Sequence, residues 1–193
     1  MGSFKNAREF IITNKMREFK EVENNVISLI HLDEKYLYDM WEYSKNEKLY
    51  EHFEYDCHKN IEETSRYLKK LMHDSDGINC HVYFVKLKEI NKVIGSINIH
   101  KIDRKRESCH IGYAISPDFW GKGIFGSALD LCLDELVKYH KMYRITALTS
   151  QENIRSIKSL QKKGFIIEGT LKNFYKDSNG LRFNALLLTL IND

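Results

Sequence analysis

The stretch Trp120-Gly121-Lys122-Gly123-Ile124-Phe125-Gly126 follows an extended, alternating segment and opens an amphipathic helix. Its glycines allow main-chain N–H groups to point inward without obstruction by side chains. The free N–H groups and the positive dipole end of the following helix attract an anion. This stretch therefore predicts a strand, a phosphate-binding loop and a helix, in that order.

Hydrophobic patterns on both sides of the loop predict the neighbouring elements. Three runs rich in β-branched and aromatic residues, at 80–87, 93–102 and 109–116, are separated by charged turns and predict an antiparallel meander. After the loop, a helix over 122–140 carries an apolar stripe that we expect to be buried. The stripe consists of Ala128, Leu129, Leu131, Cys132, Leu136 and Val137.

The remaining chain continues this α/β pattern. Strands are predicted at 144–149, 165–175 and 182–191, with a helix that Asn153 caps and Gly164 ends. Nearer the N-terminus we expect a strand at 26–31, a helix capped by Asp33 and a helix at 61–73. The order is one strand, two helices, three strands, a helix, a strand, a helix and two strands.

The chain reads as one domain over 26–193, preceded by a charged N-terminal extension over 1–25. Its only proline is Pro117, and neither a repeat nor a low-complexity stretch provides a linker. With 193 residues, of which 42% are apolar and 30% charged, the chain is long enough for one sizeable core.

Composition also narrows the partners. Thirty basic against 27 acidic residues leave a net charge of +3, which is too small to indicate nucleic-acid binding. The sequence has neither an apolar run of ~20 residues nor an apolar signal region, so we expect no membrane partner and a cytoplasmic location. Four cysteines match neither metal-ligand nor disulfide spacing and are expected to be reduced core thiols. They are Cys57, Cys80, Cys109 and Cys132.

The element order and several motifs resemble the GCN5-related N-acetyltransferase (GNAT) family over roughly 26–191. The most specific matches are Ile111-Gly112-Tyr113, the Trp-Gly-Lys-Gly-Ile loop, Asn153 with Ser156, Gly164-Phe165 and Glu168-Gly169-Thr170-Leu171. Within the family the spacing is similar to the branch of ribosomal-protein N-terminal acetyltransferases. The resemblance implies an α/β fold with a mixed, mostly antiparallel central sheet flanked by helices and with its fourth and fifth strands splayed apart.

Two other interpretations of the glycine loop are open. Gly121-x-Gly123-x-x-Gly126 also spells the dinucleotide-binding fingerprint, but that site needs an acidic residue about 20 positions on, at the end of the next strand. Here the next strand ends at Thr149-Ser150. The glycines could also form a purely structural turn. Neither interpretation explains Asn153 and Ser156.

The resemblance implies acetyl-CoA as the acyl donor. Its pantetheine arm would lie between the splayed strands, against main-chain groups of Ala114 and Ile115. Its pyrophosphate would lie on Gly121, Lys122, Gly123, Ile124, Phe125 and Gly126. The family usually has Gly or Ala at the position of Phe125. Asn153 and Ser156 would contact the cofactor as well, although Asn153 as a simple helix cap is an alternative.

Transfer to an amine requires that the amine lose a proton and the leaving thiolate gain one. Ser156 matches the family serine that donates a proton to sulfur; otherwise it is an ordinary polar helix residue. The family's glutamate is replaced by Phe174 and Tyr175. We therefore consider His110 as the base, with Glu107 and Tyr175 as further candidates. Each also has a structural interpretation, as a hydrogen-bonded histidine, a turn charge and a rim aromatic.

Aromatic and acidic residues near the first two helices are the candidate acceptor site, because they suit an amine that arrives as a cation. They are Trp41, Tyr50, Glu51, His52, Phe53 and Glu54, and the alternative is ordinary helix packing. A hairpin at 174–180 is expected to cover the acceptor.

The expected reaction is direct attack in a ternary complex, on a protein N-terminal amine or on a small amine such as a polyamine, an aminosugar nucleotide or an antibiotic. A non-catalytic acetyl-CoA-binding sensor and a homodimer are left open. No metal site is expected.

Overall fold

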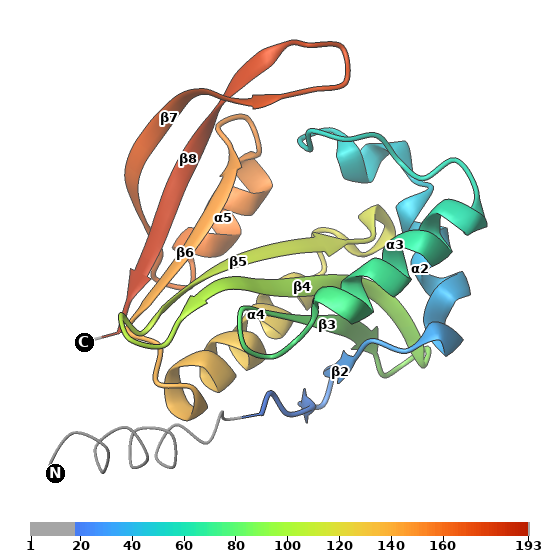
Figure 1. The fold of residues 1–193 in the computed structure, drawn as a ribbon, viewed down its shortest axis with the longest axis horizontal. Helices are drawn as coiled ribbons and strands as arrows, with labels where there is room; N and C mark the ends of the chain where they lie inside the picture. The colour runs from blue at the N-terminus through green and yellow to red at the C-terminus, as the bar shows by residue number, and fades with distance from the viewer. Residues whose placement is uncertain (1–17, 193) are drawn as a thin grey trace, which may run out of the picture.

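The computed structural model describes residues 18–192, and these form one eight-stranded sheet with helices on both faces (Figure 1). The strand order is β1-β2-β3-β4-β5-β6-β8-β7, and only β5 and β6 are parallel neighbours. The strands are β1 (Val22–Glu23), β2 (Ile27–His31), β3 (Cys80–Leu87), β4 (Lys92–Asp103), β5 (Ser108–Ile115), β6 (Arg144–Ser150), β7 (Ile166–Lys176) and β8 (Arg182–Ile191). The predicted α/β class and the antiparallel meander are confirmed.

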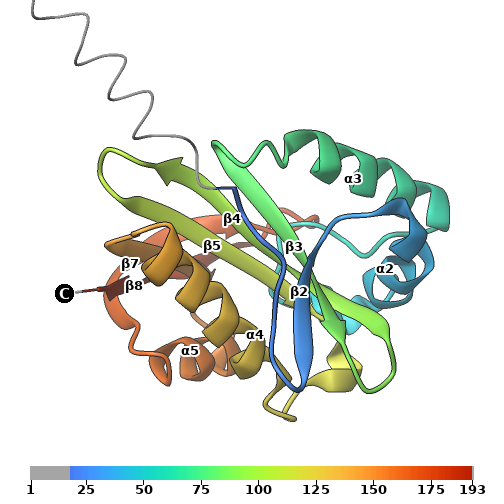
Figure 2. The ribbon, with the colours of Figure 1, turned by 90° about the horizontal axis from the view of Figure 1, so that it is seen from below.

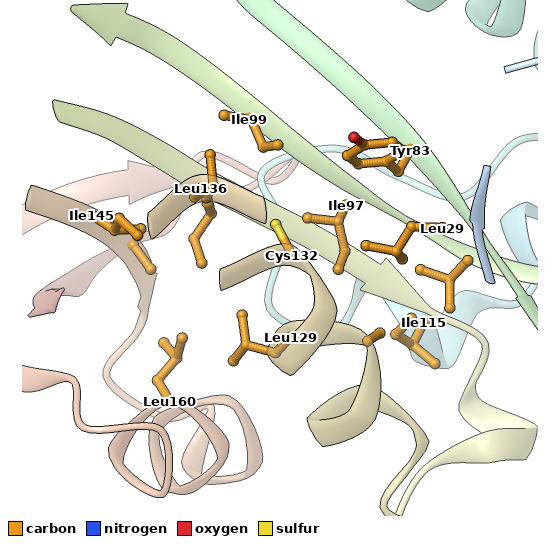
Figure 3. Packing of buried hydrophobic residues seen from close by; sticks show 14 of the residues in the cluster. Leu29, Tyr83, Ile97, Ile99, Ile115, Leu129, Cys132, Leu136, Ile145 and Leu160 are labelled. Atoms are coloured by element: carbon orange, nitrogen blue, oxygen red, sulfur yellow. The ribbon is translucent and has the colours of Figure 1, made fainter. Parts of the chain in front are cut away.

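Within residues 18–192, four α-helices cover the sheet, two on each face (Figure 2). They are α2 (Leu37–Ser44), α3 (Ile61–Asp74), α4 (Ile124–Asp134) and α5 (Ile154–Gln161). Because both faces are covered, the central strands are buried along most of their length, including Val82 to Val85 and Val93 to Ile97. Figure 3 shows Leu129 and Cys132 of α4, and Leu136 just after it, packed against these strands.

The long helix differs from its prediction at both ends. It begins at Ile124 rather than 122, because Gly123 at φ 75° is its left-handed cap. Its last turn, Glu135–Tyr139, is π-helical, with the His140 N–H donating to the Glu135 carbonyl. Leu131 and Val137, which we expected to be buried, are only partly buried because a helix on a sheet buries a narrow stripe.

Local signals placed the other helices well. The Asp33 side chain caps a 3-10 turn, Glu34–Tyr36, that leads into α2. The Asn153 Oδ1 accepts the Ser156 N–H at 3.1 Å and caps α5, and Gly164 has the expected positive φ of 87°. All four cysteines are free thiols, but only Cys109 and Cys132 are buried, since Cys57 and Cys80 lie in less covered segments.

The part of the predicted extension that the structure describes packs on the sheet. Phe19 is 2% exposed, and the short β1 pairs with β2. The Tyr83 hydroxyl donates to the Lys20 carbonyl at 2.7 Å. Residues 1–17, the rest of that extension, lie outside the described residues. Among the described residues, no helix is long and apolar enough to cross a bilayer.

The feature that positions the site is the fork between β5 and β6 (Figure 1). Residues 108–111 of β5 pair with residues 144–147 of β6, and beyond these residues the two strands no longer pair. The rest of β5 therefore bonds to β4 alone, and the strand ends diverge. This confirms the predicted splayed pair.

Candidate functional site

The glycine loop ends at the open side of the fork. Gly121 and Gly123 have φ values of 74° and 75°, in the left-handed region that favours glycine. A Cβ atom added at either position would meet no described atom within 4 Å, so space lies above both residues. No described side chain caps α4, so its first N–H groups have neither a side-chain acceptor nor an intrahelical one. This arrangement fits a pyrophosphate.

The loop is joined to β5 by Trp120. Its indole Nε1 donates to the Ile115 carbonyl at 2.8 Å, so that oxygen already has a partner. One strand away, a Cβ atom at Gly95 would lie 2.2 Å from the Ala114 carbonyl oxygen. Only glycine at 95 permits this close approach, and the approach sets the path of β5 at Ala114 and Ile115. These two residues lie beyond the paired part of the fork, where the sequence placed them.

A hydrogen bond of Ser156 joins α5 to β5, and a ring contact then joins β5 to α4. Its Oγ lies 2.6 Å from the Tyr113 hydroxyl of β5, and the residue is only 8% exposed. The Tyr113 ring packs on Phe125 in the first turn of α4, with ring centroids 4.1 Å apart. Burial raises the pKa of the Tyr113 phenol well above its usual value, so this hydroxyl keeps its proton. The Tyr113–Ser156 pair thus lies at the start of both α4 and α5.

His110 lies three residues before Tyr113 on β5, so its side chain projects from the opposite face of the strand. Its Nδ1 is 2.9 Å from the Thr146 Oγ1, and its ring meets His100 with centroids 4.8 Å apart. Burial, followed by His100 and Lys101, lowers the pKa of His110 to about 4. An imidazole with this pKa is neutral near pH 7 but binds a proton weakly. The structure does not bring His110 together with Ser156.

Tyr175 and Glu107, the other candidates for proton transfer, have different surroundings. Burial first, and then the Glu54 carboxylate, raises the pKa of Tyr175 to about 12, so the phenol remains protonated. Glu107 lies in the turn before β5, at the paired end of the fork. Its carbonyl accepts the N–H groups of Tyr143 and Arg144.

The predicted acceptor residues come together only in part. Tyr50 and Phe53 form an aromatic cluster with Tyr55, with ring centroids 5.3–5.8 Å apart. His52 follows Tyr50 by two residues and is half-buried. Trp41 lies on α2, where its ring is 5.7 Å from the Lys45 Nζ, and it makes no described ring contact with the cluster.

The segment 51–56, between α2 and α3, is termed the acceptor loop, and its acidic residues contact the neighbouring elements. Glu54 accepts the Lys176 N–H at 3.1 Å, and Asp56 accepts the Ser178 hydroxyl at 2.8 Å. These bonds join the loop to the β7–β8 hairpin across the fork. Glu51 lies 3.7 Å from Arg155 of α5, and the Arg155 guanidinium stacks 3.7 Å above the Trp120 ring. Arg155 of α5 therefore contacts both the acceptor loop and Trp120 at the start of the glycine loop.

Two surface cavities lie outside the glycine loop. One of about 520 Å³ is lined by β1, β2 and the Asp33–Tyr36 segment, and contains none of the predicted site residues. The other, of about 360 Å³, lies between 150–152 and 182–184, beside the N-terminus of α5. Neither of these two cavities is lined by the glycine loop. No cluster of three or more metal-ligating side chains occurs among residues 18–192.

Sequence reasoning missed Tyr113 and Trp120 as site residues, although both belong to quoted motifs. Their contacts reach Ser156 and Arg155, far along the chain. In the sequence, the only indication of their role is that a tyrosine and a tryptophan lie close to the glycine loop. Lys122, which was assigned to the pyrophosphate, is exposed and lies over the Phe119 ring, 5.3 Å from its centroid.

Comparison with known proteins assigns this architecture. The model of the acetyltransferase (GNAT) domain matches residues 27–166. An uncharacterized N-acetyltransferase p20 of Bacillus licheniformis is 29% identical over 109 residues, which are 56% of this chain and 61% of the relative. The ribosomal-protein-serine acetyltransferase of Escherichia coli is 28% identical over 89 residues, which are 46% and 49%. The chain thus matches about half to three fifths of the length of these relatives.

Solved structures share the fold. The ribosomal-protein-S5-alanine acetyltransferase of Vibrio fischeri superimposes with a TM-score of 0.78 at 23% identity, over 90% of this chain and 97% of that one. The microcin C7 self-immunity acetyltransferase MccE, solved in complex with acetyl-CoA and AMP, has a TM-score of 0.77 at 22% identity, over 88% and 94%. Together with the domain match, the fork and the glycine loop, these similarities show that the chain belongs to the GNAT acetyltransferase family.

Proposed function

We propose that this protein transfers an acetyl group from acetyl-CoA to a primary amine, and that the amine is a protein N-terminus. The observation that carries the proposal is the pair of positive-φ glycines at the uncapped start of α4, beside the fork. The N–H groups at this helix end suit a diphosphate. Similarity to a ribosomal-protein-serine acetyltransferase supports a protein N-terminus as the acceptor.

Different residues would bind the two parts of the cofactor and the amine. Gly121, Gly123 and the first turn of α4 would hold the pyrophosphate, and main-chain groups near Ala114 would hold the pantetheine arm. Acetyl-CoA, when bound, supplies the acetyl group as a thioester. The carboxylates of the acceptor loop would attract the ammonium form of the amine.

Ser156 is the proton donor in this proposal. The ammonium first loses one proton to solvent, and the neutral amine then attacks the thioester carbon. The Ser156 hydroxyl donates a proton to the sulfur as the C–S bond breaks, and it regains the second proton that the nitrogen loses as the C–N bond forms. The low pKa of His110 and its position on the opposite face of β5 argue against His110 as the base.

Binding and turnover test the proposal separately. Calorimetry with acetyl-CoA should show binding to a single site, and free CoA should appear only when an amine is added. The amine panel contains peptides with free N-termini, the same peptides with blocked N-termini, polyamines, aminosugar nucleotides and amine antibiotics. We expect turnover with the free peptides. Faster turnover with a small amine than with the free peptides would mean that the acceptor is that small amine and not a protein N-terminus. Acetyl-CoA binding without turnover of any amine in the panel would indicate a sensor. Absence of both would reject the proposal.

A further inference from the structure

The Tyr113–Ser156 bond has a preferred direction. A phenol is a stronger acid than an aliphatic alcohol, so the more stable arrangement has the Tyr113 O–H donating and the Ser156 Oγ accepting. The separation of 2.6 Å is typical of a good O–H···O bond. In this arrangement the Ser156 proton is not used by Tyr113 and points elsewhere.

The surroundings hold both partners in place. Phe125 packs against the Tyr113 ring, and the Asn153 side chain accepts the Ser156 main-chain N–H. Both hydroxyl groups therefore belong to side chains whose positions are set by other contacts. Phe125, which departs from the small residue usual at its position, has a role here as the surface on which Tyr113 rests.

Resting on the proposed function, we infer that Tyr113 is a positioning residue for Ser156. Its O–H bond orients the Ser156 hydroxyl so that the serine proton is presented to the leaving sulfur. It also stabilises the negative charge that grows on Oγ as that proton departs, because a donor aimed at a developing oxyanion strengthens in the transition state. Tyr113 itself exchanges no proton with substrate.

The test is a double-mutant cycle of Tyr113→Phe and Ser156→Ala, which keeps the ring and removes one hydroxyl at a time. Tyr113→Phe should lower kcat roughly fivefold to tenfold, as expected for the loss of one hydrogen bond, with the acetyl-CoA KM unchanged. In the Ser156→Ala background the same change should have no further effect on kcat. Equal effects in both backgrounds would overturn the inference.

Two further measurements are independent of turnover. The Kd for CoA, measured by calorimetry, should be the same for the wild type and for Tyr113→Phe. Unfolding midpoints in urea should be non-additive across the cycle, because both single variants break the same bond; additive shifts would count against it. If the wild type transfers no acetyl group, the proposed function fails, whereas an active wild type with an unaffected Tyr113→Phe variant refutes only this inference.

Tyr83→Phe is the matched control. Tyr83 is fully buried, and its hydroxyl donates to the Lys20 carbonyl, away from the fork. This variant also loses one buried tyrosine hydrogen bond, and it should shift the unfolding midpoint without changing kcat. A fall in kcat as large as that of Tyr113→Phe would show that loss of stability explains both.

Discussion

Two glycines decide whether the first N–H groups of α4 can face a ligand. Gly121 and Gly123 hold left-handed backbone conformations that cost other L-residues roughly 1–2 kcal/mol each. Because space lies above both, a side chain there would not clash with the described residues but would enter the space proposed for the pyrophosphate. In the proposed site the glycines would therefore serve binding as well as folding.

Gly123→Ala should weaken acetyl-CoA binding about tenfold or more, because the methyl group stands over the N–H groups that would contact the diphosphate. Calorimetry measures this Kd. Gly77→Ala is the control, since Gly77 also has a positive φ, 68°, with no described atom within 4 Å of an added Cβ. Both variants should lose similar stability, and only Gly123→Ala should change the Kd. An unchanged Kd for Gly123→Ala would place the cofactor elsewhere.

At the scale of elements, the β7–β8 hairpin and the loop between α2 and α3 meet across the fork. Their contacts, from Lys176 to Glu54 and from Ser178 to Asp56, involve exposed groups. Exposed bonds of this kind contribute little to global stability. They hold the hairpin and the loop together over the proposed acceptor site. These bonds should therefore influence acceptor binding more than folding.

The double variant Glu54→Ala with Ser178→Ala should therefore raise the acceptor KM by roughly threefold to tenfold, as expected for the loss of about 1 kcal/mol of positioning. Steady-state kinetics with the best amine of the panel measure it. The acetyl-CoA Kd and the urea midpoint should stay near those of the wild type. Glu89→Ala, in the exposed turn between β3 and β4, is the control. An unchanged acceptor KM would exclude the hairpin from the acceptor site.

Across the described part of the molecule, partial or full burial lowers the pKa of several histidines. His81 stacks on Phe19 with ring centroids 4.3 Å apart, and burial, followed by His31 and His140, lowers the pKa of His81 to about 3. In the unfolded chain the same imidazole has a pKa near 6.5. Between these pH values the unfolded chain binds a proton that the folded protein does not, so stability falls as the pH falls.

We expect the free energy of unfolding to be highest above pH 6.5, and His81 alone to lower it by roughly 2 kcal/mol at pH 5. Urea denaturation at pH 7, 6 and 5 measures this slope. His81→Phe keeps a ring against Phe19 and should flatten the slope. Equal slopes for the wild type and His81→Phe would contradict the expectation.

The sequence by itself determined the α-helices and strands from β2 onward, their order and the position of the glycine loop. Periodicity, caps and turn residues act between near neighbours, and so Asn153, Gly164 and the three meander strands were read correctly. The π-helical turn at Glu135–Tyr139 was not, because its main-chain bonding leaves no mark on the apolar pattern. The family followed from motif spacing, which is also local.

Only the tertiary structure decided which side chains meet. Tyr113 and Ser156 are 43 positions apart, and Ser178 and Asp56 are 122 apart. Their contacts depend on how far β5 and β6 diverge and on how α4 and α5 pack, quantities that arise from the whole core. The same packing turned His110 away from Ser156 and buried Phe19. Local chemistry therefore selects the fold, and long-range packing assembles the site.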